Sequence, residues 1–179
     1  MVFTHIKETS FVLENFIVIY FCDMDTLDNS FEDKKEKAKI LYNAQKEIRN
    51  PYFGQVINLN AEGFHHLQFS AKRERDKREQ LLKFSLLPLT FEVIRKAGTV
   101  QEYRTELAPI GKRSARGEIS MKKIEYWGFD AIVGEKKIKI RTVVRRVGAG
   151  SIIFWSVMPI VKLRKGTNPK LFTAGIEDN

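Results

Sequence analysis

The stretch that decides the fold is Ile138–Lys162, which reads IKIRTVVRRVGAGSIIFWSVMPIVK. It alternates apolar and basic residues, turns at a Gly-Ala-Gly sequence, and returns as a second apolar strand. A period of two residues around a glycine-rich turn is typical of a β-hairpin. Alternation places Arg141 and Arg145 on one face of the first strand and Arg146 on the other. We therefore expect one face to bury against a core while the other displays guanidinium groups that could bind phosphate.

The composition indicates a basic, globular chain. Its 179 residues are 43% hydrophobic and 30% charged, and the net charge is +9. The hydrophobic fraction is enough for one hydrophobic core. The positive net charge makes polyanions the leading class of partner. The single cysteine, Cys22, cannot form an internal disulfide, and three histidines offer no zinc-ligand spacing. We therefore expect a reducing, cytoplasmic setting and no metal or other cofactor.

One apolar run, Ser10–Cys22, is the candidate targeting segment. It contains Glu14 and Asn15 and is too short to span a bilayer. It also lacks the basic start and the small-residue cleavage site of a signal peptide. We predict a buried strand or a short helix here, and no membrane partner.

The order of elements predicts an α+β fold. Helical spacing covers 31–48, a short strand is expected at 55–59, and Asn60 is a good N-cap for a second helix. Helix is expected through Leu86, with a break or kink at Pro88. Three strands then follow in series, so we expect N-terminal helices on one face of an antiparallel sheet of about four strands. The predicted parts are an N-terminal extension (1–49), the α+β domain (50–165) and a flexible tail (166–179).

Two adjacent histidines are candidates for acid–base chemistry. His65 and His66 fall early in the second helix, off the centre of its apolar stripe. A neutral imidazole titrates near working pH and suits a general acid or base. The alternative is a solvated or capping histidine. Of the two, His66 is the stronger candidate, because Ser70 and Arg73 share its face.

The hairpin carries further candidates. Arg141 and Arg145 would bind phosphate or stabilise charge on a phosphorane, although charged strands often serve solubility alone. Ser156 could hydrogen-bond a scissile phosphate, and Trp155 could stack on a base or belong to the core. Ser156 lacks the sequence context of a hydrolase nucleophile.

Other basic residues are candidates for contacts with a nucleic acid. They lie in the charged run Lys72–Gln80, in the basic loop GKRSARGE and on the hairpin, and comprise Arg73, Arg75, Arg113 and Arg146. The charged run contains interspersed acids, so a solvated helix face with i,i+4 ion pairs is the alternative. The chain has no phosphate-binding loop, no H-E-x-x-H motif and no dinucleotide-binding glycine pattern. Nucleotide cofactors and catalytic zinc are therefore disfavoured, and Asp23–Asp33 does not match an EF-hand.

Two segments resemble the barnase/EndoU/colicin/RelE-like ribonucleases, especially the branch found in phage and bacterial toxin-type proteins. The first is NPYFGQVINLNAEGFHHL (Asn50–Leu67), which is similar to that branch's short strand and G-x-x-H-L helix. The second is KIRTVVRRVGAGSIIFWSV (Lys139–Val157), which is similar to its strand, glycine turn and strand ending in an aromatic-Ser pair. The resemblance covers about 50–162.

The resemblance implies an RNA-cleaving domain that needs no metal. His66 would be the acid or base, Arg141 and Arg145 would stabilise the phosphorane, and Ser156 would bind the phosphate. The chain departs from this pattern because no second histidine lies in the sheet. Glu125 is the nearest carboxylate that could complete the pair, and Tyr126 is a possible proton donor.

The function expected from these features is a metal-independent endoribonuclease, for example a toxin that acts on tRNA or mRNA. A non-catalytic module that binds nucleic acid or regulates a partner through the same basic face is the alternative. A third interpretation is a structural phage or mobile-element protein whose basic face only aids solubility. A toxin would also be expected to have an acidic inhibitor that shields the arginines.

Overall fold

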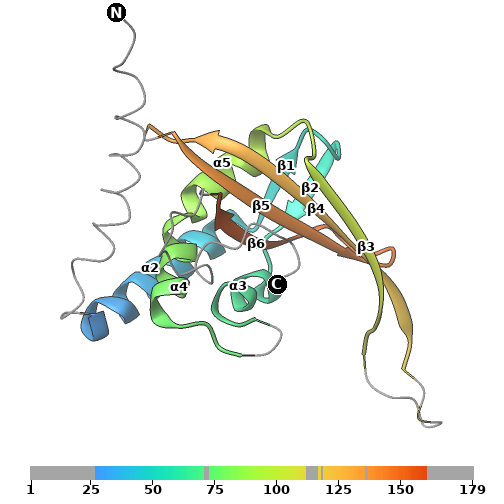
Figure 1. The fold of residues 1–179 in the computed structure, drawn as a ribbon, viewed down its shortest axis with the longest axis horizontal. Coiled ribbons are helices and arrows are strands. Elements are labelled where there is room, and N and C mark those ends of the chain that lie inside the picture. Colours follow the sequence, from blue (N-terminus) through green and yellow to red (C-terminus); the bar gives the residue numbers. More distant parts are fainter. Residues whose placement is uncertain (1–26, 71–72, 112–116, 118, 136, 161–179) are drawn as a thin grey trace, which may run out of the picture.

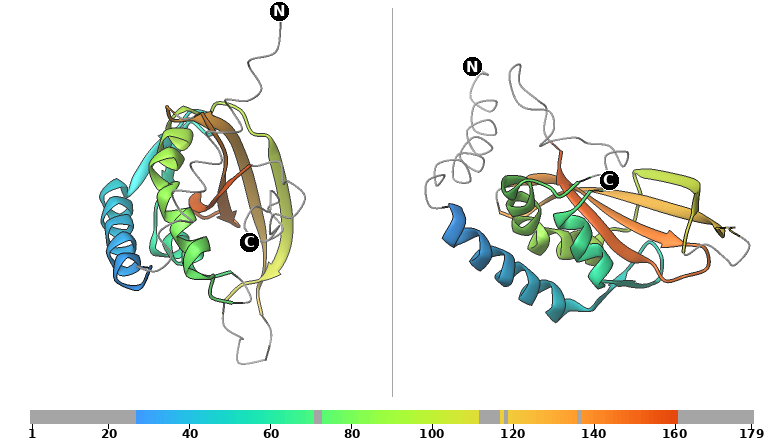
Figure 2. Two further views of the ribbon diagram at one scale, coloured as in Figure 1. Left: turned by 60° about the vertical axis from the view of Figure 1, so that its left-hand side comes forward. Right: turned by 90° about the horizontal axis from the view of Figure 1, so that it is seen from below.

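The computed structural model describes residues 27–160, apart from 71–72, 112–116, 118 and 136. Within these residues, four helices and six strands follow one another: α2 (Leu27–Gln45), β1 (Glu47–Asn50), β2 (Gln55–Asn58), α3 (Ala61–Gln68), α4 (Lys77–Ser85), α5 (Leu87–Lys96), β3 (Glu102–Pro109), β4 (Met121–Val133), β5 (Ile138–Val147) and β6 (Ile153–Pro159). The strands form one sheet in the order β1-β2-β6-β5-β4-β3. The helices lie to one side of this sheet (Figures 1 and 2).

The long hairpin predicted from the sequence is confirmed as β5 and β6. It closes at Gly148, whose positive φ of 55° is a conformation that glycine adopts without strain. β4 and β3 extend the sheet on one side by antiparallel pairing. On the other side β6 runs parallel to β2, and the two pair only at Asn58 and Ile153.

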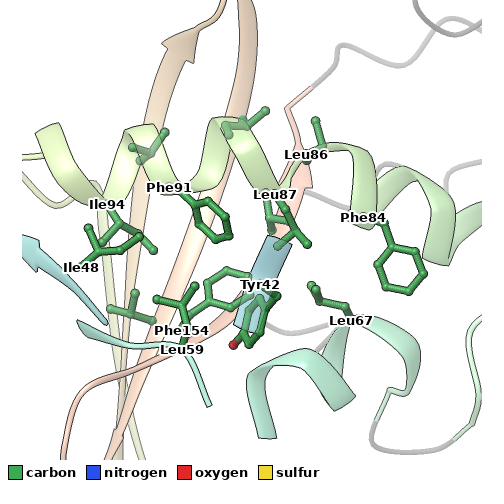
Figure 3. Close-up of a cluster of buried hydrophobic side chains, with 14 of the residues drawn as sticks. Tyr42, Ile48, Leu59, Leu67, Phe84, Leu86, Leu87, Phe91, Ile94 and Phe154 are labelled. Atoms are coloured by element: carbon green, nitrogen blue, oxygen red, sulfur yellow. The ribbon is translucent and has the colours of Figure 1, made fainter. Parts of the chain in front are cut away.

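The main core lies between the helices and the sheet. Tyr42 of α2 packs against Phe64 and Phe154, with ring centroids 5.3 and 5.9 Å apart. Side chains from α3, α4 and α5 fill the space around it (Figure 3), and the labelled set is Tyr42, Ile48, Leu59, Leu67, Phe84, Leu86, Leu87, Phe91, Ile94 and Phe154. Their burial supplies the main hydrophobic stabilisation of the fold.

Local signals set the helix boundaries. Asn60 caps α3, since its side chain accepts a hydrogen bond from the Gly63 amide at 3.0 Å. Asp76 caps α4 in the same way through the Glu79 amide at 2.8 Å. Pro88 lies in the first turn of α5, where its missing N–H leaves no helical bond unmade. The break expected at Pro88 is therefore present.

The α+β class is confirmed, and the expected sheet is corrected in two respects. It has six strands instead of four, and it is mixed because β2 and β6 are parallel. The short strand expected at 55–59 is confirmed as β2, and the two additional strands are β1 and β3, one at each edge of the sheet. β1 has only four residues, too few to show a clear period of two. β1 includes Glu47 and Ile48, which were expected to end a helix.

The expected domain boundary after residue 49 falls inside β1, and α2 contributes Tyr42 to the core. The predictions for Ser10–Cys22 and for the tail 166–179 lie outside the described residues. Among the helices that the structure describes, none is long and apolar enough to cross a bilayer.

Candidate active site around Trp155

Helix α3 lies directly against β6. A Cβ atom added at Gly63 would lie 2.3 Å from the Phe154 carbonyl oxygen and 2.6 Å from Tyr42 Oη, so only glycine permits this approach. Because β2 pairs with β6 at one position only, the rest of that edge is available to α3 and α4. The approach brings the last turn of α3, which carries His66, beside the centre of β6.

A β-bulge in β6 directs Trp155 out of the regular ladder. Val143 pairs with Ser156 and the next residue of β5, Val144, pairs with Phe154, so Trp155 is the extra residue without an opposite partner. A bulge re-aims the side chain of the extra residue and occurs often near active sites. Here it sets Trp155 beside Val143 and Met158, in a small apolar cluster separate from the main core.

The indole of Trp155 stacks with two candidate residues. The His66 imidazole lies 4.0 Å from it, centroid to centroid, with a tilt of 17°. The Arg145 guanidinium carbon lies 3.5 Å from its ring centroid. Two groups this close would collide on one face, so they occupy opposite faces and form a His66–Trp155–Arg145 stack. A cation over an indole face is a favourable contact, especially where water is excluded.

Glu62 completes the group of charged residues. Its carboxylate pairs with the Arg145 guanidinium. Glu62 precedes His66 by four residues, so both project from one face of α3. The Arg145 side chain is 9% exposed and that of Glu62 is 52% exposed. Glu62 is therefore the solvent-facing member of a carboxylate, imidazole and guanidinium set.

The segment between α3 and α4 contacts the backbone of His66. Arg75 donates from Nε to the His66 carbonyl oxygen at 3.3 Å, and its guanidinium also pairs with Glu79. Arg73 bonds the second oxygen of Glu79 at 3.2 Å. An i,i+4 ion pair of the kind suggested for the charged run is present between Arg75 and Glu79, but both residues are buried and do not form a solvated helix face.

Ser156 lies in this region, bound to a lysine. The buried amine of Lys83 donates to Ser156 Oγ at 3.0 Å and to the Val157 carbonyl oxygen at 2.9 Å. Burial, and to a smaller extent the Arg75 cation, lower the pKa of Lys83 to about 7, while Glu79 opposes the shift. Ser156 is fully buried, so it acts as a structural partner of Lys83 in this conformation.

Three buried N–H groups at the site have no acceptor among the described residues. They belong to Arg145 (Nε), Trp155 (Nε1) and Arg75 (Nη2). Buried donors are nearly always hydrogen-bonded in proteins, so a cluster of unsatisfied donors calls for an explanation. Both guanidinium groups are paired with carboxylates, so an anionic ligand would have to compete with Glu62 for Arg145 and with Glu79 for Arg75.

The other hairpin arginines belong to separate ion-pair groups. Arg141 bonds both oxygens of Asp130, at 2.6 and 2.9 Å, and also pairs with Glu102. Arg146 lies on the opposite face of β5 from Arg145 and bonds Glu125 at 2.6 Å. The structure therefore brings Arg145 alone of these three to His66, and the expected row of guanidinium groups is divided among carboxylates.

The Glu125 carboxylate binds three side chains. It accepts from the Tyr103 hydroxyl at 2.7 Å, from Arg146, and from Lys123 at 3.1 Å. The Tyr103 hydrogen bond and then the Arg146 hydrogen bond lower the pKa of Glu125 to about 2. Tyr126, the proton donor suggested with it, donates to Glu106 at 3.2 Å. Glu125 is therefore not the carboxylate beside His66; Glu62 is.

The remaining candidates lie apart from the stack or outside the described residues. His65 is exposed and stacks on Phe69 at 4.4 Å. Arg113 belongs to the segment that the structure does not describe. Sequence reasoning missed Glu62 and Lys83. The spacing of Glu62 and His66 was a usable signal for the first, whereas the contact between Lys83 and Ser156 joins residues 73 positions apart.

Among the described residues, no group of three or more His, Cys, Asp or Glu side chains is arranged to hold a metal ion. No protein-family model matches this chain, and neither a curated protein nor a solved structure matches it. The functional inference therefore rests on the geometry of the site.

Proposed function

We propose that this protein is a metal-independent endoribonuclease whose reacting groups are Glu62, His66 and Arg145. The observation that supports this function is the placement of a carboxylate, an imidazole and a guanidinium around one indole ring. These are the chemical types needed to move two protons and to neutralise a phosphorane. The unsatisfied donors of Arg145 and Arg75 add binding capacity for a phosphate.

The reaction would be an attack by the 2′-hydroxyl on the adjacent phosphate. A phosphate oxygen of RNA first replaces the Glu62 carboxylate on Arg145, which frees Glu62 to accept the 2′-hydroxyl proton. The 2′-oxygen–phosphorus bond then forms, and the bond to the 5′-oxygen breaks as protonated His66 donates its proton to that oxygen. The products are a 2′,3′-cyclic phosphate and a 5′-hydroxyl end.

Glu62 suits the first step because its side chain is the exposed member of the set. Arg145 suits phosphate binding because its planar guanidinium is held on the indole while the Nε–H remains unsatisfied. Trp155 serves to position both His66 and Arg145, instead of stacking on a base, because both faces of its ring are occupied.

The test is incubation of purified protein with total RNA in EDTA, followed by analysis of the product ends. We expect cleavage with cyclic phosphate ends, a loss of about 100-fold or more in His66→Ala, and a similar loss in Glu62→Gln. His65→Ala removes an exposed imidazole outside the stack and should retain activity. Intact RNA, or equal cleavage by the wild type and His66→Ala, would reject the proposal.

A second candidate is a module that binds RNA without cleaving it. The observation that favours it is the burial of His66 and Arg145, which are 6% and 8% exposed. This function predicts RNA binding that weakens steeply as salt rises, and no products at any protein concentration. Arg145→Ala should then weaken binding, while His66→Gln should leave the RNA equally intact.

A further inference from the structure

Strand β3 forms one edge of the sheet and has the features of a pairing surface. It is eight residues long, pairs with β4 without a register shift, and lies at the end of the strand order. It runs along the outer rim of the molecule, beyond the helices (Figures 1 and 2). Tyr103 and Leu107 on this strand are 50% and 70% exposed. A long edge strand presents a row of N–H and C=O groups that can pair with another strand.

Among the described residues, two known ways of protecting an edge strand, a β-bulge and a proline within the strand, are missing from β3. The strand has no bulge in its pairing with β4, and its one proline, Pro109, is the last residue. The charges on its second face alternate as Glu102, Arg104 and Glu106, and Arg104 also pairs with Glu106 of its own chain at 3.2 Å. Mixed charges of this kind repel another copy in some registers and attract it in others, so they select a partner and a register.

We propose that β3 pairs edge to edge with β3 of a second copy of this chain, antiparallel and centred on Thr105. A two-fold axis perpendicular to the sheet relates the copies, so each pair of opposite residues shares a face. With Thr105 on the axis, Tyr103 faces Leu107 of the second copy, and Arg104 faces its Glu106. Each of these contacts occurs twice, and Thr105 faces its own copy.

Neighbouring registers are less favourable. With Arg104 on the axis, two arginines oppose each other and Glu102 faces the second copy's Glu106. With Glu106 on the axis, two glutamates oppose each other and Arg104 faces an alanine. Like charges directly opposite are destabilising, and aromatic–aliphatic and opposite-charge pairs are stabilising. Centring on Tyr103 or Leu107 engages only one end of the strand. The Thr105 register therefore satisfies both faces along residues 102–108.

The interface would be small. A single strand edge buries less than the about 1,600 Å² of a standard interface, so the dimer should depend on protein concentration. It does not rest on the proposed nuclease activity, because none of the residues of the stack lies on β3. Two copies would form one continuous sheet of twelve strands with its two halves related by symmetry.

The test uses charge complementation, followed by analytical ultracentrifugation from about 1 µM to about 1 mM. The wild type should form dimers as concentration rises. The Arg104→Glu chain presents carboxylates at both positions and the Glu106→Arg chain presents guanidinium groups at both. Each alone should dimerise at least about 10-fold more weakly, with an unchanged far-UV spectrum. An equimolar mixture of the two should recover the dimer, because every charged pair is again complementary.

A cysteine pair tests the register. In a Cys22→Ser background, Thr105→Cys should form an intermolecular disulfide on mild oxidation, because residue 105 opposes itself. Arg104→Cys should cross-link much less, since its opposite residue is at position 106. A wild type that stays monomeric at all concentrations overturns the proposal. A dimer that both charge variants leave intact, or equal cross-linking by the two cysteine variants, also overturns it.

Discussion

Lys83 provides a sharp test of the described site, because a buried amine makes folding stability depend on pH. Its amine is fully enclosed and bonded to Ser156 and to the Val157 carbonyl. Burial lowers its pKa from 10.5 to about 7. We predict that the free energy of unfolding rises between about pH 7 and about pH 9, and that Lys83→Met abolishes this rise.

The sign follows from proton counting. Between the folded pKa of about 7 and the unfolded value of 10.5, the unfolded chain holds one more proton at Lys83 than the folded chain. Raising the pH therefore favours folding, with a limiting slope of about 1.4 kcal/mol per pH unit. At the folded pKa the slope has half of its limiting value. The free energy of unfolding should therefore rise by about 2 kcal/mol from pH 7 to pH 9. Below about pH 6 the dependence on this group levels off.

The assay is urea denaturation at a series of pH values in a Cys22→Ser background, because a thiol titrates in the same range. Met has a similar length to Lys and carries no charge, so Lys83→Met removes the titration while filling the space. Lys96→Met is the matched control, since Lys96 is exposed on α5 and pairs with Glu92. A flat wild-type profile, or a rise that persists in Lys83→Met, would refute the assignment of the buried amine.

Three further predictions concern close packing, a buried amide and a low carboxyl pKa. Gly63→Ala should lower the free energy of unfolding by about 1–3 kcal/mol in urea denaturation, because the new methyl group would overlap the Phe154 carbonyl. Gly98→Ala is the control: its Cβ would have no atom within 4 Å, so the free energy of unfolding should change by less than about 1 kcal/mol. Asn50→Ala should cost about 3 kcal/mol in urea denaturation, because the buried amide donates to the Ile94 and Ala97 carbonyl oxygens; a loss below about 1 kcal/mol would contradict this role. Glu125 keeps its charge down to about pH 2, so its contribution to stability is present above about pH 4.5 and is lost as the pH falls toward 2. In thermal melts, Glu125→Gln should therefore reduce the fall in melting temperature between about pH 4.5 and about pH 2. An unchanged fall would contradict the low pKa of Glu125.

Much of the sheet could be predicted because long strands repeat their signal. Apolar residues recur with a period of two around the glycine turn of the β5–β6 hairpin, and the N-cap residue Asn60 marks the start of α3. The sequence also predicted that His66 and Arg145 lie at one site, and the stack on Trp155 brings them together. β2 agrees with the short strand expected at 55–59, whereas β1 could not be recognised, because its four residues carry too little periodicity.

The details of the site depended on three-dimensional contacts. Alternation alone would treat Trp155 as an ordinary strand residue, whereas the bulge makes it the extra residue between Phe154 and Ser156. Alternation also grouped Arg141 with Arg145, but Asp130 of the neighbouring strand pairs with Arg141. Which carboxylate meets which arginine depends on strand register, and register is a property of the assembled sheet.

By itself, the sequence determined the α+β class, the hairpin, the helix caps and the basic character of the chain, since each arises from residues close together along it. Only the tertiary structure decided that Glu62 pairs with Arg145, that Lys83 is buried against Ser156, and that β3 is left at an edge. Those features join segments far apart in the chain. They depend on how the helices pack on the sheet, and no local pattern of side chains specifies that packing.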